Sequence, residues 1–259
     1  MASNPKTWCN YDFCCQFEPG SWNAKYCHEH KCKRLQENAL KRIDAPIPSD
    51  DPTELWQRQE DRKKGLMKLS QAKNEWLLNT STFGFFDIET FDLSAEFGLV
   101  MVSCIKQRDG QTVTYVAHGD KDERECLLAT RDAIESVDFV VTYYGTGFDV
   151  PYLNTRLLIH NERPIGQFRH IDMYYTARHK LRLQRNRMAN VELALLDSVQ
   201  KTAIKPGIWR KALQGDGEAL EYIVDHCQRD VAILGDIFER LRGFINLSAV
   251  RWRRFGASY

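Results

Sequence analysis

The sequence contains no long apolar run. None of its stretches reaches the roughly 18 uninterrupted apolar residues of a membrane-spanning helix, and residues 1–6 lack the apolar core of a signal peptide. Internal repeats and low-complexity tracts are also missing, which excludes solenoid and fibrous proteins. These absences predict a soluble, intracellular protein, cytoplasmic in location, that has no membrane as a partner.

The net charge is also close to zero: the chain has 36 Lys and Arg residues and 35 Asp and Glu residues, which gives a formal charge of +1. The two signs are nevertheless separated along the chain: the charge is +2 over residues 1–80, −6 over residues 81–170 and +5 over residues 171–259. With 259 residues, 43% of them hydrophobic, the chain is long enough for one or two domains with a buried core. Near-neutrality is therefore a cancellation between an acidic middle and a basic C-terminal part.

Five of the eight cysteines lie within the first 32 residues. Clustered cysteines in a reducing compartment indicate metal ligation more than disulfides. Two closely spaced pairs, Cys9-x4-Cys14 and Cys27-x2-His30, are separated by twelve residues and supply the four ligands of a tetrahedral Zn²⁺ site. The arrangement resembles small zinc-binding modules that pair a Cys-x4-Cys knuckle with Cys-x2-His at the start of a helix. We therefore expect a zinc-finger module over residues 1–43 that holds one structural Zn²⁺.

Further donors leave the ligand set of this module open, namely Cys15, His28 and Cys32. A set of free thiols without metal is the alternative, but a 43-residue segment with few aliphatic residues can hardly fold unaided. Basic residues continue the module from residue 31 to residue 34. They predict contact with nucleic acid or with a protein partner.

A proline-rich stretch and a helix separate this module from the rest of the chain. Residues 44–53 place three of the eight prolines beside three acids, a composition that cannot sustain a helix. From Thr53 to Leu78 the pattern is helical, with Leu66, Leu69, Trp76 and Leu77 near one face. We assign residues 44–80 to a linker and helix, and residues 81–259 to a main domain.

The main domain begins with short β-rich runs, expected over residues 83–88, 99–106, 112–118, 139–144 and 168–173. Helical patterns over residues 122–136 and 148–161 alternate with the later strands, and mostly helices follow. Three strands in a meander, then crossovers through helices, imply a mixed five-stranded sheet covered by helices on both faces. The fold class is α/β, and the order matches the ribonuclease H-like fold.

Acidic residues stand at the ends of these elements. Asp87 and Glu89 lie two apart on an otherwise apolar strand, so both side chains share one face. Such carboxylates repel each other unless they are neutralised, and hard divalent cations prefer carboxylate oxygen. A solvated strand end is the alternative for this pair. Asp149 follows the fourth strand through a two-glycine turn, where a helix cap is the alternative, and Asp230 lies in the final long helix with His226.

In order and spacing these motifs resemble the DEDD superfamily of 3′-to-5′ exonucleases, also called DnaQ-like, which share the ribonuclease H-like fold. The resemblance covers roughly residues 82–245, the length of one domain. Segments 171–172, 191–199 and 227–231 look closest to the branch that contains the proofreading domains of family B polymerases. The family's three motifs fall on Asp87 with Glu89, on Asp149, and on Asp230 with His226.

The resemblance implies hydrolysis of nucleic acid, DNA slightly favoured, to nucleoside 5′-monophosphates at single-stranded or frayed 3′ ends. Two Mg²⁺ or Mn²⁺ ions roughly 4 Å apart can activate a water and stabilise the phosphate charge. By analogy, Asp87 would bridge both ions, Glu89 and Asp230 would complete the water-activating site, and Asp149 would hold the second ion largely through water. A ribonuclease or structure-selective endonuclease, and a non-catalytic nucleic-acid-binding module, are the alternatives.

His226 departs from the family pattern. The His-type branch places its histidine five residues before the last aspartate, whereas the Tyr-type branch places a tyrosine four before, which is the spacing of His226. Asp225 fills the position five before Asp230. A four-residue offset keeps both side chains on one helix face, so His226 is a candidate general base. A structural histidine at the helix surface is the alternative.

A basic run and a short apolar stretch are the candidates for binding nucleic acid. Between residues 178 and 187 the chain carries five cations and no acid, namely Arg178, Lys180, Arg182, Arg185 and Arg187. A solvated helix face is the alternative. Relatives insert an apolar wedge after the first motif, for which Phe91 or Leu93 is the candidate here, with core packing as the alternative. Thr90 is a further candidate contact to nucleic acid. Tyr144 stands where many relatives carry asparagine, and we expect Asp172 to cap the following helix.

Overall fold

The computed structural model describes residues 7–8, 16–17, 52–196, 204–250 and 252–254. The chain divides into two compact units, Met1–Met67 and Lys68–Tyr259. In the first unit, strands β1 (Thr7–Trp8) and β2 (Gln16–Phe17) pair in the antiparallel sense. The predicted zinc ligands Cys9, Cys14, Cys27 and His30 lie outside the described residues.

Helix α2 (Pro52–Thr80) occupies the stretch where the sequence predicts a helix. Near its end, Leu78 is buried in the core of the second unit. Asn74 donates to the carbonyl of Ile245 at 2.9 Å and accepts from the backbone N–H of Leu247 at 2.7 Å. Of the residues predicted near one face, Leu66, Leu69 and Trp76 are exposed, whereas Leu77 packs against the core of the second unit. Within the described part of the chain, no helix combines the length and apolarity needed to cross a membrane.

The second unit is built on a mixed sheet with the strand order β5-β4-β3-β6-β7-β8. The first three strands form an antiparallel meander, and β3, β6 and β7 run parallel. Their bounds are β3 (Phe83–Phe91), β4 (Leu99–Gln107), β5 (Thr112–Val116), β6 (Phe139–Thr142), β7 (Gln167–Asp172) and β8 (Trp252–Arg254). The predicted meander and crossovers are confirmed. The sheet gains a sixth strand, because β8 pairs antiparallel with β7 at the edge.

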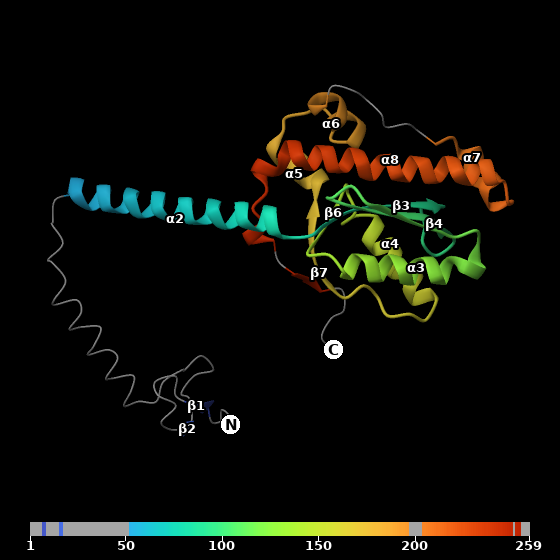
Figure 1. The fold of residues 1–259 in the computed structure, drawn as a ribbon, viewed down its shortest axis with the longest axis horizontal. Coiled ribbons are helices and arrows are strands. Elements are labelled where there is room, and N and C mark those ends of the chain that lie inside the picture. Colours follow the sequence, from blue (N-terminus) through green and yellow to red (C-terminus); the bar gives the residue numbers. More distant parts are fainter. Residues whose placement is uncertain (1–6, 9–15, 18–51, 197–203, 251, 255–259) are drawn as a thin grey trace. The chain divides into compact units, whose positions relative to one another are not determined.

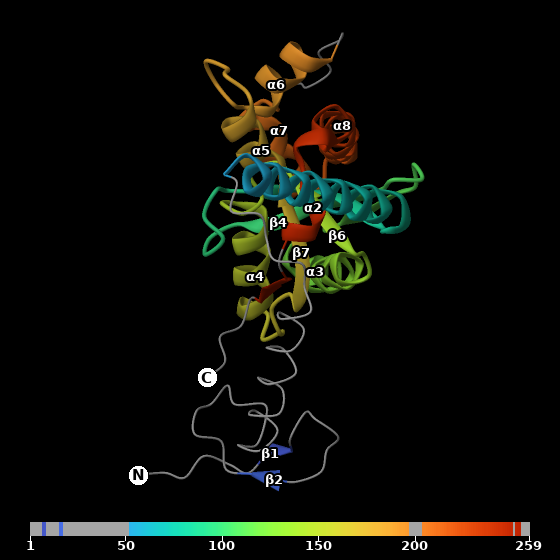
Figure 2. The ribbon, with the colours of Figure 1, turned by 90° about the vertical axis from the view of Figure 1, so that its left-hand side faces the viewer.

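Helices cover both faces of this sheet (Figures 1 and 2), as the α/β prediction requires. Helix α8 lies along one face, and α3 and α4 lie along the other. The bounds are α3 (Asp120–Glu135), α4 (Asp149–Ile159), α5 (Met173–Lys180), α6 (Met188–Leu195), α7 (Pro206–Leu213) and α8 (Gly217–Leu241), with short 3₁₀ helices at Arg242–Phe244 and Leu247–Ala249.

Alternation along β3 divides the core in two. Phe83 and Phe85 pack on the α8 side with Phe238, with ring centroids 5.2 and 5.5 Å from that of Phe238. Phe86 and Ile88 belong to the second cluster, on the side of α3 and α4. Because side chains alternate along a strand, Asp87 and Glu89 continue the row of Phe83 and Phe85 toward α8. The sheet itself therefore aims both carboxylates at one helix.

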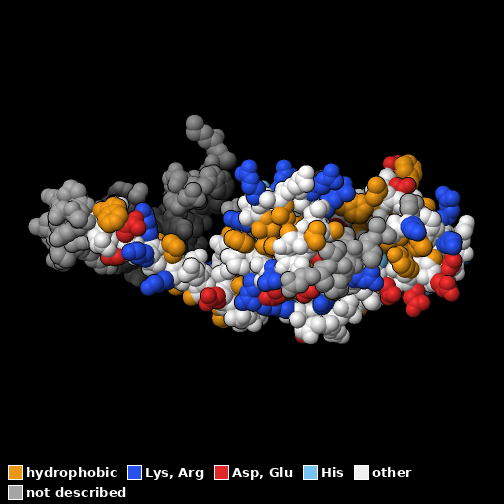
Figure 3. All heavy atoms as spheres, turned by 90° about the horizontal axis from the view of Figure 1, so that it is seen from above, with side chains coloured by type: hydrophobic (Ala, Val, Ile, Leu, Met, Phe, Trp, Pro, Cys, Tyr) orange, Lys and Arg blue, Asp and Glu red, His pale blue; other side chains and the backbone are white. Residues whose placement is uncertain are grey.

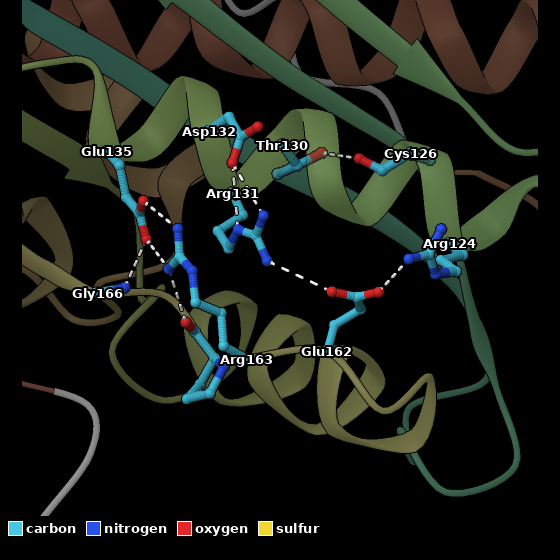
Figure 4. A network of polar contacts seen from close by, with 10 residues as sticks. Arg124, Cys126, Thr130, Arg131, Asp132, Glu135, Glu162, Arg163 and Gly166 are labelled. Carbon is cyan, nitrogen blue, oxygen red and sulfur yellow. Dashed lines mark hydrogen bonds and ion pairs between the residues drawn. The ribbon is translucent and has the colours of Figure 1, made fainter.

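A surface network ties α3 to the segment that leads into β7 (Figure 4). Arg163 binds Glu135 through two N–H groups, at 2.6 and 2.8 Å, and Glu135 also accepts from the backbone of Gly166 at 2.7 Å. Arg131 and Arg124 both pair with Glu162. The pairs are partly exposed, and each contributes at most about 1 kcal/mol to stability.

Candidate active site

The site is formed where β3 extends beyond its neighbour. β3 pairs with β6 only through residues 83–85, and β6 ends at Thr142. Beyond that point the backbone N–H of Ile88 donates to Oδ1 of Asp149 at 3.2 Å. Asp149 is the first residue of α4, where the helix N-terminus favours a negative charge. The carboxylate of Asp149 thus lies beside Ile88, the residue between Asp87 and Glu89.

Helix α8 brings the remaining predicted residues to the same place. His226 and Asp230 are buried, at 7% and 3% exposure, on the helix face that packs against the sheet. Nε2 of His226 lies 3.5 Å from Oε1 of Glu89 and 3.6 Å from Oδ2 of Asp230. Asp225, five residues before Asp230, is exposed. The four-residue spacing therefore directs the imidazole toward the carboxylates, and not to the helix surface.

Cys227 makes the contact with Asp87. Its Sγ lies 3.5 Å from the backbone oxygen of Asp87 and 3.8 Å from Oδ2 of the same residue. Burial raises the pKa of the Cys227 thiol well above its ordinary value, so the group stays protonated and can donate. Asp87 therefore contacts α8 through Cys227, and Glu89 contacts it through the preceding residue, His226.

The donor set fits a divalent cation. One ligand atom each of Glu89, His226 and Asp230 lie within 4.8 Å of one another. Carboxylate oxygens are the donors that Mg²⁺ and Mn²⁺ prefer. Asp172 stands apart from this set, because Oδ1 accepts from the N–H groups of Tyr144 and Tyr174 and Oδ2 from that of Thr146. Its side chain caps α5, as the sequence predicts.

Two cavities flank the carboxylates. One of about 470 Å³ is lined by Asp87, Tyr143, Tyr144, Tyr174, Arg187 and Met188. The other, of about 400 Å³, is lined by residues 88–93 together with Phe148 and Trp209. Thr90, Phe91 and Leu93 thus lie in the second cavity, beside Glu89. Asp87 thus lines the first cavity and Glu89 the second.

Of the five predicted basic residues, one lines a cavity of the site. Arg187 lines the cavity that contains Asp87. The other four cations are exposed and line neither cavity, namely Arg178, Lys180, Arg182 and Arg185. Figure 3 shows Lys and Arg side chains gathered along one edge of the face that carries α6 and α8, with exposed hydrophobic side chains beside them.

Sequence reasoning missed several residues of the site. Tyr143, Tyr174 and Met188 line the first cavity, Phe148 and Trp209 line the second, and Cys227 touches Asp87. Cys227 follows His226 directly, so the helical position was a usable signal. Trp209 lies on α7, far from the other lining residues in sequence, and no local pattern places it there.

A mixed sheet of this order, with carboxylates at the end of its central strand, defines the ribonuclease H-like class of α/β proteins. The family model described as "RNase_H superfamily" matches residues 84–242, more than half of the chain, and this protein belongs to that superfamily. Glu89, His226 and Asp230 all lie within the residues that the family model matches.

The fold is also similar to a solved structure, the family B DNA polymerase from the hyperthermophilic archaeon Pyrobaculum calidifontis. The TM-score is 0.51 and the sequence identity is 17%. The match covers 64% of this chain and 26% of that chain, so the protein corresponds to about a quarter of the polymerase. A comparison with curated proteins found no match.

Proposed function

We propose that the protein is a metal-dependent 3′-to-5′ exonuclease that hydrolyses nucleic acid, DNA in preference to RNA, to nucleoside 5′-monophosphates. One observation carries the proposal: Glu89, His226 and Asp230 converge within 4.8 Å at the end of the central strand. Asp87 and Asp149 flank them through contacts with Cys227 and Ile88. The set combines the four carboxylates of the DEDD pattern with an imidazole.

The carboxylates would hold two Mg²⁺ or Mn²⁺ ions. Glu89 and Asp230 would hold one ion, Asp149 would contribute to the other, and Asp87 would serve both. Bound cations would supply charge for the scissile phosphate and make a water easier to deprotonate. His226 would accept the proton of that water at Nε2, the ring nitrogen that faces Glu89 and Asp230.

The two cavities suggest how a strand is held. The terminal nucleotide would occupy the cavity beside Glu89, where Thr90 offers a hydroxyl and Phe91 an aromatic face. Arg187 would hold a phosphate in the cavity beside Asp87. Four further cations, Arg178, Lys180, Arg182 and Arg185, would add electrostatic attraction for the rest of the strand.

Residues 1–43 would form a separate module around one structural Zn²⁺, joined by residues 44–80 to a catalytic domain of residues 81–259. Cys9, Cys14, Cys27 and His30 supply the donor types and spacing for tetrahedral zinc. The module would recruit nucleic acid or a partner protein through its basic residues.

The proposal is tested with single-stranded DNA and RNA labelled at either end, incubated with Mg²⁺ or Mn²⁺ and either the wild type or Asp87→Ala. A 3′ label is expected to appear at once as mononucleotide, while a 5′ label passes through successively shorter products. Internal fragments formed first would favour an endonuclease. Preferred cleavage of RNA would favour a ribonuclease.

A further inference from the structure

Tyr144 has an unusual backbone in the loop between β6 and α4. Its φ is 68°, in the left-handed region that a bulky side chain seldom adopts. The conformation is imposed from outside, because Asp172 accepts hydrogen bonds from the N–H groups of Tyr144, at 2.8 Å, and Thr146, at 3.0 Å. Strain of this kind concentrates at functional sites. The loop therefore holds one tyrosine in a costly position beside the Asp87 cavity.

Contacts with Gly147 and Tyr174 also fix the position of the Tyr144 ring. A Cβ atom on Gly147 would lie 2.6 Å from Cζ of Tyr144, so the ring rests directly on the glycine. The edge of the ring meets Tyr174, with 4.9 Å between the centroids. The side chain nevertheless remains 45% exposed. Packing of the hydrophobic core does not account for an aromatic side chain that is fixed and exposed at once.

From Tyr144 a row of aromatic rings continues along α5. Tyr174 and Tyr175 lie 5.2 Å apart between centroids, and the rings of Tyr175 and His179 stack at 6.4 Å. Tyr144 also reaches Tyr175, at 6.4 Å. Tyr174 lines the cavity that contains Asp87, whereas His179 is exposed in the last turn of the helix. The row thus leads from the carboxylates to the surface.

Cations accompany this aromatic row. Arg178 and Lys180 stand in the last turn of α5, and Arg187 lines the same cavity as Tyr144. The loop that carries Arg187 is tied to the cavity, because the hydroxyl of Tyr143 donates to the carbonyl of Asn186 at 2.6 Å. No acid occurs between residues 178 and 187. Exposed aromatic faces beside cations are the combination that binds unpaired bases and their phosphates.

We infer that Tyr144, Tyr174 and Tyr175 form a stacking surface for unpaired bases of the nucleic-acid strand that enters the Asp87 cavity. The inference rests on the proposed function and extends it, because it assigns the preference for single strands to named side chains. In a duplex, neighbouring base pairs cover the faces of each base. A strand must therefore be single or frayed to engage this row, and because every base has a π-face, the sequence matters little.

Three variants test the surface. Tyr144→Leu removes the ring, Tyr144→Phe keeps it as the matched control, and Gly147→Ala pushes the ring aside through the new Cβ. Each is assayed for KM and kcat on a single-stranded oligonucleotide of the sugar that the wild type prefers. The same oligonucleotide with abasic nucleotides beside the 3′-terminal residue reports binding without stacking. A p-nitrophenyl ester of a nucleoside 5′-monophosphate reports whether the wild type hydrolyses a phosphodiester without a bound strand.

Tyr144→Leu and Gly147→Ala are expected to raise KM for the normal oligonucleotide roughly 5- to 100-fold, the loss of one stacked base. Tyr144→Phe should stay near wild type, and the abasic substrate should show little difference among the proteins. The inference is overturned if Tyr144→Leu keeps the wild-type KM, or if the variants lose as much on the abasic substrate.

If the proposed exonuclease function is wrong, the wild type hydrolyses neither the oligonucleotide nor the ester, and this result is distinct from a failure of the stacking surface. Fluorescence anisotropy of a labelled single strand with Ca²⁺ then measures binding directly. Weaker binding by Tyr144→Leu than by Tyr144→Phe would still support the stacking surface, and equal binding would contradict it.

Discussion

Nε2 of His226 lies 3.5 Å from Oε1 of Glu89, across the interface between α8 and the central strand of the sheet. Asp230, one helical turn later, lies at 3.6 Å from the same nitrogen. An imidazole between two carboxylates is well placed to take a proton from a water that reacts there. It is placed this way because α8 buries residues 226, 227 and 230 on one face.

Replacing His226 by Gln is expected to lower kcat roughly 100- to 10,000-fold, the usual contribution of a general base. Glutamine keeps a polar side chain at this position but accepts no proton at neutral pH. Binding of Mn²⁺, measured by calorimetry, should change little because the carboxylates remain. Activity within a few-fold of wild type would remove His226 from the role of base.

Cys227 is expected to position Asp87. Cys227→Ala removes the donor that faces the Asp87 carboxylate, and affinity for Mn²⁺ should fall roughly 10-fold or more, as for other groups that orient a metal ligand. Cys227→Ser keeps a donor and should recover most of the affinity. Equal Mn²⁺ affinities in Ala, Ser and wild-type proteins, with comparable thermal unfolding, would show that the thiol only fills space.

Glu123 should control stability in acid. Burial opposes its ionisation, but hydrogen bonds from Arg156, His160 and the N–H of Val100 outweigh burial and hold the pKa below the ordinary 4.5. Because the folded-state pKa is the lower one, ionised Glu123 stabilises the protein above pH 4.5, and this stability is lost as the pH falls through the folded-state pKa.

Glu123→Gln, which leaves Arg156 buried without its charge partner, should therefore cost about 3–5 kcal/mol in urea unfolding at pH 7. The difference from wild type should shrink below pH 4.5. Arg163→Ala is the matched control, since it breaks the exposed pair with Glu135 and should cost at most about 1 kcal/mol. A pH-independent difference between Glu123→Gln and wild type would contradict the linkage.

Zinc content provides a separate test of the N-terminal module. The purified protein is expected to carry one Zn²⁺ per chain by elemental analysis, and Cys9→Ala or Cys27→Ala should lose it. Cys126→Ala, which changes a buried cysteine of α3, should keep the metal. Zinc retained by all variants, or absent from the wild type, would refute the module.

Most of the fold follows from local patterns. Short β-rich runs predict β3 and β4, and the helical period predicts α3 and α8. β8 escapes prediction because Trp252–Arg254 is three residues long and two of them are arginine. The expected fourth strand ends two residues early, at Thr142, because the side chain of Asp172 takes the N–H of Tyr144.

Some residues of the candidate site can likewise be recognised from the sequence, and others cannot. Asp87, Glu89, Asp149 and Asp230 are recognisable because their spacing follows the motif order of a family. Trp209 and Tyr174 are not, because each comes to share a cavity with the acids only after helices α7 and α5 have folded back onto the sheet. Residues that approach the acids only through tertiary packing cannot be identified from the sequence around them.

The most direct test of the account follows a 5′-labelled single strand with Mg²⁺ or Mn²⁺, comparing the wild type with Asp230→Asn. The account predicts that the wild type shortens the strand one nucleotide at a time from its 3′ end and releases nucleoside 5′-monophosphate. Chelation of the metal, or the loss of the Asp230 carboxylate, should abolish this. A wild type that degrades no strand with either metal, or an Asp230→Asn protein as active as wild type, would contradict it.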